Sequence, residues 1–293
     1  AYQQVLEEVT TRFLKPFLQH TGHTRVARAG GVASNVKLNQ RIAELPGVEA
    51  VFVHPAMSDM GSGTGAALLL ASARDGLKPF PMRDAYLGPA YTEAEMEAAL
   101  RRGGLPFRKV PDLAKEVAGL LAAGKVVARF DGRMEYGPRS LGNRSILYPA
   151  KDPDVNRWLN QRLRRTEFMP FAPIVLAEHA PALFVGLGRA AHAAEFMTLT
   201  FDCTDRMKAE SPAAVHVDGT ARPQLLRREV NPWLHGMMTE YHRLTGLPVL
   251  INTSFNMHEE PIVCSPDDAV KGFLDSRLDR LAMGDFLAEL PHD

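Results

Sequence analysis

The sequence predicts an α/β protein of about two domains. Apolar residues recur at helical spacing in several segments, and short apolar runs bounded by glycine or proline, typical of buried strands, stand between them. The 293 residues are 45% hydrophobic and 23% charged, a globular composition that excludes disorder and collagen-like repeats. No run approaches the ~18 apolar residues of a membrane span. With only two cysteines we expect no disulfide framework and a cytoplasmic protein.

The first part of the chain alternates helices and strands around two glycine-rich turns. Apolar residues predict an opening helix that ends near Pro16 or shortly after His20. A strand over 25–29, a helix over 33–45 and a buried strand over 50–53 follow. We expect a glycine-rich turn over 58–64 and an apolar helix over 65–73.

Proline content predicts a linker over 78–89. We place the domain boundary within it, which divides the chain into domains 1–86 and 87–293. The second domain opens with a capping box, Thr92 followed by Glu95. Periodicity then predicts helices over 112–123, 153–163, 232–245 and 266–276, the last capped by Ser265, and strands over 125–130, 172–176 and 248–252.

The formal net charge is zero, but the charges are unevenly spread. Residues 129–165 hold nine basic and four acidic side chains, a surplus of +5, and 257–293 hold three basic and nine acidic ones, a balance of −6. A local arginine surplus in a neutral protein indicates an anion site rather than a broad nucleic-acid surface.

The densest chemical segment is 131–146, DGRMEYGPRSLGNRSI. Arg133, Arg139 and Arg144 share it with three glycines. Arginine can hold phosphate in bidentate fashion, and glycine lets backbone N–H groups approach an anion. A solvated flexible loop is the alternative. Downstream, Arg164 could belong to the same site or favour the dipole of a helix C-terminus.

A second segment, PVLINTSFNMHEEPIV over 248–263, joins a buried strand to polar residues. Asn252, Thr253, Ser254 and Asn256 stand at its end, where ligands of α/β sheets collect. These amide and hydroxyl groups could orient a small polar ligand, although a turn capped by Asn and Ser is the common alternative.

The third candidate region pairs GGVASN over 30–35 with SDMGSGTG over 58–65. Glycine turns that open helices favour phosphate or nucleotide contacts through helix N-termini. Asp59, ahead of the second set of glycines, could bind a metal. Neither segment is a complete nucleotide-binding fingerprint, and tight packing between helix and strand also explains such glycines.

The order of six motifs resembles the antibiotic and nodulation-factor O-carbamoyltransferases over nearly the whole chain: GGVASN, FVHPAMSDMGSGTGAAL, YLGPAYTEAEM, GRMEYGPRSLGNRSIL, RPQ and GLPVLINTSFNMHEEPIV. In that family an actin/Hsp70-like (ASKHA) ATPase domain, related to the tRNA threonylcarbamoyl-transferring protein, precedes a YrdC-like domain. The resemblance implies that 1–86 is the C-terminal part of the first domain and that 87–293 is the whole second domain.

The resemblance implies that ATP and carbamoyl phosphate form carbamoyl adenylate in the second domain, and that the first passes the carbamoyl group to a small-molecule hydroxyl. It implies that Arg139, Arg164, Arg222, Asn252 and Ser254 hold carbamoyl phosphate, with Met197 nearby. Arg133, Glu135, Asn143, Arg144 and Ser145 would shape the same pocket or the nucleotide site. In the first domain Gly30, Gly31 and Asn35 would face adenosine, and Asp59 a divalent metal such as Mg or Fe.

The paired metal-binding histidines of the family have no counterpart here, and a single carboxylate is a poor metal site. We therefore expect most metal ligands to lie outside this chain. Ala1 would mark a cut through a longer enzyme, completed by a missing N-terminal half or a partner subunit. A homodimer is also possible.

Two alternatives remain open. A YrdC-type threonylcarbamoyl-adenylate synthase of tRNA modification would use bicarbonate and threonine, although the block GPRSLGNRS argues against it. A non-catalytic nucleotide- or RNA-binding partner subunit is compatible with the arginine surplus, but few aromatics stand there to stack bases.

Overall fold

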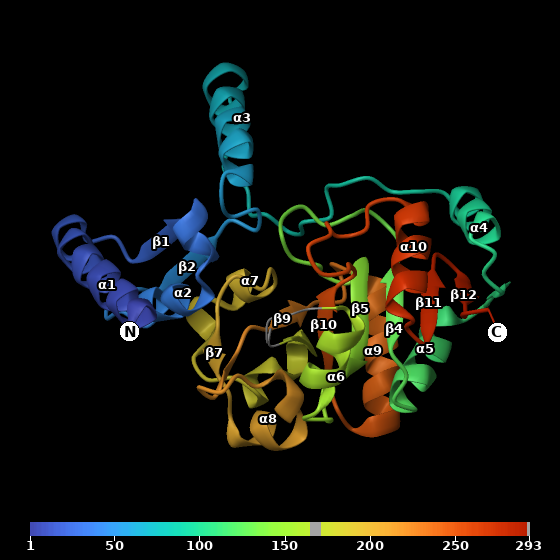
Figure 1. The fold of residues 1–293 in the computed structure, drawn as a ribbon. Coiled ribbons are helices and arrows are strands. Elements are labelled where there is room, and N and C mark those ends of the chain that lie inside the picture. Colours follow the sequence, from blue (N-terminus) through green and yellow to red (C-terminus); the bar gives the residue numbers. More distant parts are fainter. Residues whose placement is uncertain (165–170, 292–293) are drawn as a thin grey trace.

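A mixed eight-stranded sheet forms the centre of the protein, flanked by helices on both faces (Figure 1). The computed structural model describes residues 1–164 and 171–291. The α/β prediction is confirmed, since helices and strands alternate along these residues. Smaller two-stranded sheets, β1 with β2 and β7 with β8, stand beside the central one.

The strand order of the central sheet is β3-β12-β11-β4-β5-β10-β6-β9. Strand β10 lies between β5 and β6 and pairs with both in antiparallel fashion, so hydrogen-bonded strands hold it on both sides. The strands span Phe107–Lys109 (β3), Val127–Phe130 (β4), Arg144–Pro149 (β5), Ala172–Leu176 (β6), Gln224–Leu226 (β9), Val249–Ser254 (β10), Arg280–Met283 (β11) and Phe286–Ala288 (β12).

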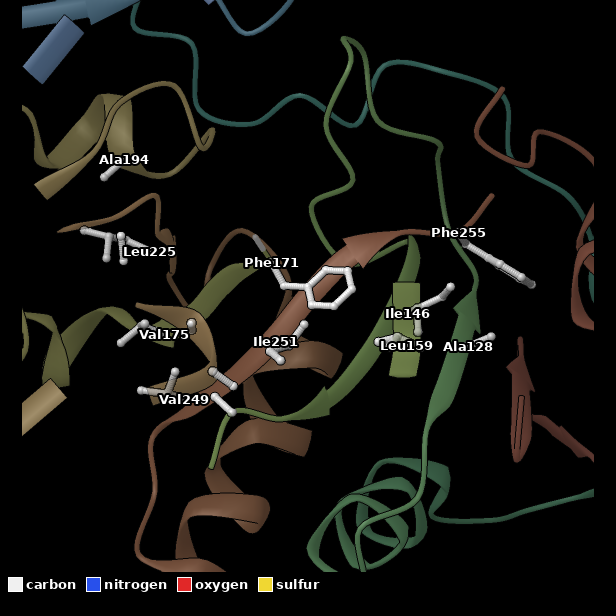
Figure 2. Close-up of a cluster of buried hydrophobic side chains, with 14 of the residues drawn as sticks. Ala128, Ile146, Leu159, Phe171, Val175, Ala194, Leu225, Val249, Ile251 and Phe255 are labelled. Atoms are coloured by element: carbon white, nitrogen blue, oxygen red, sulfur yellow. The ribbon is translucent and has the colours of Figure 1, made fainter. Parts of the chain in front are cut away.

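Both faces of this sheet are buried, because consecutive strand residues point to opposite sides. Val249 and Ile251 of β10 enter one core, which Figure 2 shows together with Leu159 of α6. Leu250, between them, enters the other core, with α5 and α9. The helices are α4 (Glu93–Arg102), α5 (Leu113–Ala122), α6 (Val155–Arg162), α9 (Pro232–Thr245) and α10 (Pro266–Ser276).

A compact insertion lies between β6 and β9. It consists of short elements: η2 (Ala177–Ala182), η3 (Leu187–Arg189), α7 (Ala191–Ala194), β7 (Phe201–Asp202), α8 (Asp205–Glu210), η4 (Pro212–Ala214) and β8 (Thr220–Ala221). Strands β7 and β8 are antiparallel. The insertion ends directly before β9 and so carries the segment around Arg222.

The first part of the chain rests on this insertion. It contains α1 (Tyr2–Thr21), β1 (Arg25–Arg28), η1 (Gly31–Ser34), α2 (Val36–Ala43), β2 (Ala50–Val53) and α3 (Met60–Asp75). The buried Asn39 side chain donates to the carbonyl of Thr198 at 2.6 Å, and the hydroxyl of Thr200 donates to Gln40 at 2.7 Å. Lys37 pairs with Asp218 at 2.8 Å. Polar contacts from α2 therefore fix this part on the second.

Helix α3 projects away from the rest of the protein (Figure 1). Gly61 is the one residue of this helix that is buried, whereas Leu69 and Leu70 are 72% and 62% exposed. Among the described residues, no helix is both long and apolar enough to cross a membrane.

Capping signals located several predicted helices accurately. The expected capping box forms at Thr92, and Ser265 caps α10 as expected, in a second capping box with Asp268. The segment 78–89, expected as the linker, contains no helix or strand. One expectation was wrong: the glycine-rich turn over 58–64 is already helical from Met60, because its glycines are accommodated in the first turns of α3. Pro16 lies inside α1, which continues to Thr21.

The arginine-rich loop 131–143 packs its backbone against the first part of the chain. Gly137 has a φ of +119°, and a Cβ placed there would lie 2.7 Å from the Pro55 carbonyl oxygen and 3.0 Å from its carbon. The hydroxyl of Tyr136 donates to the carbonyl of Met60 at 3.0 Å. Only glycine supplies both this conformation and this close approach.

We therefore expect Gly137→Ala to destabilise the protein by about 1–3 kcal/mol, through strain and displacement of the Pro55 backbone. Chemical denaturation measures this free energy of unfolding. Gly188→Ala is the matched control, because its Cβ would meet no atom within 4 Å. Equal stability of the two variants would contradict the close packing of this loop.

Candidate functional site

A cavity of about 620 Å³ opens beside the strand end of β10. Seven of the residues expected from the sequence line it: Arg139, Met197, Arg222, Asn252, Thr253, Ser254 and Asn256. They come from the arginine-rich loop, the insertion, the segment before β9, and β10 with the turn that follows it. Segments far apart in the sequence thus converge on one polar site.

Strand β10 supplies the floor of the cavity. Asn252 pairs in register with Leu147 of β5 and Ala172 of β6, and its side chain is 2% exposed. Ser254 lies at the end of the strand, opposite Ser145. Because β10 is held on both sides, the positions of Asn252 and Ser254 are set by the sheet rather than by a loop.

Two arginines supply uncompensated positive charge. In the described residues, neither Arg139 nor Arg222 has an ion pair, and Nε of Arg139 and Nη1 of Arg222 are buried without a hydrogen-bond partner. Burial lowers the pKa of Arg139. Burial, followed by repulsion from Arg139, lowers the pKa of Arg222 to about 9. Two such guanidinium groups are stabilised when an anion binds between them.

Four further residues line the cavity and were not predicted from the sequence: His258, Glu259, Glu260 and Pro261. They continue directly from the motif that holds Asn252, and this continuity is the signal that could have included them. Glu259 is exposed with a φ of +62°, and Glu260 pairs with Lys271 at 3.0 Å.

Glu135 holds the arginine-rich loop in shape. Its buried carboxylate oxygen Oε1 accepts backbone N–H groups from Leu141, Asn143 and Arg144 at 2.7, 2.8 and 3.3 Å. Burial raises the pKa of this carboxyl, while the backbone donors of Asn143 and Leu141 lower it. Glu135 does not line the cavity, so it acts on the loop and not on a ligand.

The other polar residues of this loop also bind the protein itself. The fully buried Arg144 donates to the carbonyls of Asp131, Gly132 and Asn143 and stacks 3.8 Å from the centre of the Phe130 ring. The exposed Arg133 donates to the carbonyls of Leu87 and Gly88 in the linker.

Asn143 and Ser145 complete the same scaffold. Asn143 donates to the carbonyl of Arg133, and the Ser145 hydroxyl accepts the N–H of Gly142 at 2.9 Å. We expected Arg133, Glu135, Asn143, Arg144 and Ser145 to shape the same pocket or the nucleotide site. None of them lines this cavity, and their polar atoms fold the loop that presents Arg139. A role in the nucleotide site stays a prediction.

Arg164 is not among the described residues that line the cavity. Arg164 is exposed, and its expected contact with carbamoyl phosphate stays a prediction. The neighbouring Leu163 accepts the backbone N–H of His258, which does line the cavity, at 3.1 Å. The segment 165–170 that follows Arg164 lies outside the described residues.

The two glycine motifs of the first part meet in space. Gly30 forms a bridge with Ser58, so Gly30 and Gly31 lie near Asp59 at the start of α3. A Cβ added at either glycine would meet no atom within 4 Å. The Asn35 side chain caps α2 through Leu38 and also bonds Gln3. These protein contacts occupy the amide that was expected to face adenosine.

Asp59 is exposed and makes no capping hydrogen bond. Within 1–164 and 171–291, no group of three or more histidine, cysteine, aspartate or glutamate side chains could hold a metal ion. The described residues alone do not fit a divalent cation, because one carboxylate supplies too few ligands. No chemical step is therefore assigned to a metal in this chain.

A family profile described as the carbamoyltransferase C-terminus matches residues 118–289, and one described as the carbamoyltransferase N-terminus matches residues 1–68. The chain belongs to the carbamoyltransferase family. Nodulation protein NolO of Bradyrhizobium diazoefficiens is 36% identical over 97% of this chain and 53% of its own length. Nodulation protein NolNO of Sinorhizobium fredii is 34% identical over 97% of this chain and 42% of its own length.

This carbamoyltransferase chain thus spans about half the length of the curated relatives it matches. An uncharacterized Methanocaldococcus jannaschii protein, MJ1058, is 34% identical, with 98% of this chain and 48% of the relative covered. Among solved structures, full-length HypF covers 62% of this chain at 19% identity and a TM-score of 0.41, and P. abyssi Sua5 covers 61% at 12% identity and a TM-score of 0.41.

We expect Arg222→Met to stabilise the ligand-free protein by about 1–2 kcal/mol, because it removes a buried charge that faces Arg139. The same change should abolish the rise in Tm that inorganic phosphate gives the wild type. Chemical denaturation and thermal melting with and without phosphate measure the two effects. Arg101→Met, at an exposed arginine of α4, is the control and should change neither. A destabilised variant that still responds to phosphate would contradict the anion site.

Proposed function

We propose that this chain is the C-terminal portion of an O-carbamoyltransferase and that its cavity forms carbamoyl adenylate from carbamoyl phosphate and ATP. Family membership supports the carbamoyl group as the cargo. The observation that carries the proposal is the pair Arg139 and Arg222, which both line the cavity. Both are partly buried, Nε of Arg139 and Nη1 of Arg222 are buried without a hydrogen-bond partner, and neither side chain has an ion pair among residues 1–164 and 171–291.

The chemistry requires such a site. Water cleaves carbamoyl phosphate to inorganic phosphate and carbamate, and a carbamate oxygen then attacks the α-phosphorus of ATP, with pyrophosphate as the leaving group. Each step moves negative charge onto phosphate oxygens. Preorganised cations in a site shielded from water stabilise that charge more strongly than water does. Arg139 and Arg222 would bind the phosphate oxygens, while Ser254 and Asn252 would orient the carbamoyl end.

Transfer of the carbamoyl group to a hydroxyl would follow outside this cavity, with AMP as the leaving group. Residues 1–68, which match the carbamoyltransferase N-terminus, would contribute the Gly30 and Asp59 segments to that second site. The remaining groups of that site, including most ligands of any divalent metal, would come from an N-terminal half or a partner subunit. The acceptor would be a small molecule that carries a hydroxyl.

Arg139→Ala and Arg222→Ala should each lower carbamoyl-phosphate-dependent release of pyrophosphate from ATP by at least a hundredfold, because each removes one phosphate ligand. Steady-state pyrophosphate assays on the 1–293 chain measure this rate. Arg157→Ala, at an exposed arginine paired with Asp154, serves as the control and should retain full activity.

Full activity in both cavity variants would overturn the assignment of the site. Pyrophosphate release that depends on bicarbonate and threonine instead of carbamoyl phosphate would replace the proposed function with threonylcarbamoyl-adenylate synthesis.

A further inference from the structure

A chain of buried amide groups leads from the arginine-rich loop to the floor of the cavity. It begins at the carbonyl of Leu141, which accepts a hydrogen bond from the side-chain nitrogen Nε2 of Gln224 at 2.7 Å. Because a backbone carbonyl can only accept, the atom of Gln224 that faces it must be the nitrogen. The oxygen Oε1 of Gln224 must then point the other way.

That oxygen determines the orientation of Asn252. Oε1 of Gln224 accepts a hydrogen bond from Nδ2 of Asn252 at 2.7 Å, and the carbonyl of Ser140 accepts a second one from the same nitrogen at 3.2 Å. Two acceptors thus hold the amide nitrogen of Asn252. Gln224 and Asn252 are 3% and 2% exposed, so water does not compete for these bonds.

The remaining polar atom of Asn252 is its oxygen Oδ1. This atom is buried and has no hydrogen-bond partner within the described residues, and Asn252 lines the cavity. The only hydrogen-bonding function that Asn252 can offer a ligand is therefore an acceptor. An acceptor stabilises an N–H group of a ligand and disfavours a phosphate oxygen or a methyl group beside it.

We propose that Gln224 is a positioning residue that fixes the amide of Asn252 and thereby makes the cavity select an acyl phosphate carrying an N–H donor. This inference rests on the proposed function and adds the orientation of carbamoyl phosphate in the cavity. The phosphate end of the ligand lies toward Arg139 and Arg222, and the amino group of the carbamoyl end lies against Oδ1 of Asn252.

The test compares carbamoyl phosphate with acetyl phosphate, in which a methyl group replaces the amino group. Binding of each to the 1–293 chain is measured by calorimetry, with inorganic phosphate as the probe of the arginines alone. Wild-type protein should bind carbamoyl phosphate roughly tenfold to a hundredfold more tightly than acetyl phosphate, because acetyl phosphate leaves Oδ1 buried and unpaired.

Gln224→Leu releases the Asn252 amide, which can then turn, so the affinity ratio should fall to within about threefold while phosphate affinity stays within about twofold. A general loss of structure would weaken phosphate binding as well. Tyr86→Phe is the matched control: Tyr86 donates to the same Leu141 carbonyl at 2.9 Å but does not contact Asn252, so this variant should keep the wild-type ratio.

The outcomes separate the two proposals. If the wild type binds carbamoyl phosphate and acetyl phosphate equally tightly, the proposed role of Gln224 is overturned. It is also overturned if Gln224→Leu keeps the wild-type ratio of the two affinities. If Arg139→Ala leaves the binding of carbamoyl phosphate intact, or if the wild type binds no carbamoyl phosphate, the proposed function fails and this inference fails with it.

Discussion

The carboxylate of Glu135 is the contact on which the rest of the site depends. One oxygen of this carboxylate accepts hydrogen bonds from three backbone N–H groups of the arginine-rich loop. The guanidinium group of Arg144 donates hydrogen bonds to backbone carbonyls of the same loop. These bonds fix the turn that carries Ser140 and Leu141, whose carbonyls hold Asn252 and Gln224. The loop thereby presents Arg139 and orients the floor of the cavity, although neither Glu135 nor Arg144 lines it.

Much of the fold could be predicted from local signals. The helices at 232–245 and 266–276 begin at Pro and at a Ser cap and match the observed bounds of α9 and α10. Strand β2 and strand β6 are short apolar runs with clear breakers and were equally evident. The strands β11 and β12 were not predicted, because such short strands owe their structure to pairing with strands far away in the sequence, β11 with β4 and β12 with β3.

The site could be predicted only in part. Asn252 and Ser254 stand at the C-terminal end of a buried strand, so their place in a polar site could be expected from the sequence pattern. The sequence does not distinguish an arginine that faces a ligand from one that binds its own backbone. Arg139 and Arg144 stand five residues apart in one motif, yet the fold leaves the first uncompensated and surrounds the second with carbonyls. Gln224 stands in the motif RPQ, but its role could not be predicted, because that role depends on Leu141 and Asn252, both distant in sequence.

The contact between Gly137 and Pro55 has a consequence for how this protein can vary. A side chain at position 137 requires the backbone of the turn after β2 to move, and that turn leads directly to Asp59 and α3. The arginine-rich loop and the β2–α3 turn therefore cannot accept insertions or larger residues independently of each other. These two segments, although far apart in the sequence, are therefore constrained to vary together. Exchange of either segment for that of a relative requires exchange of the other.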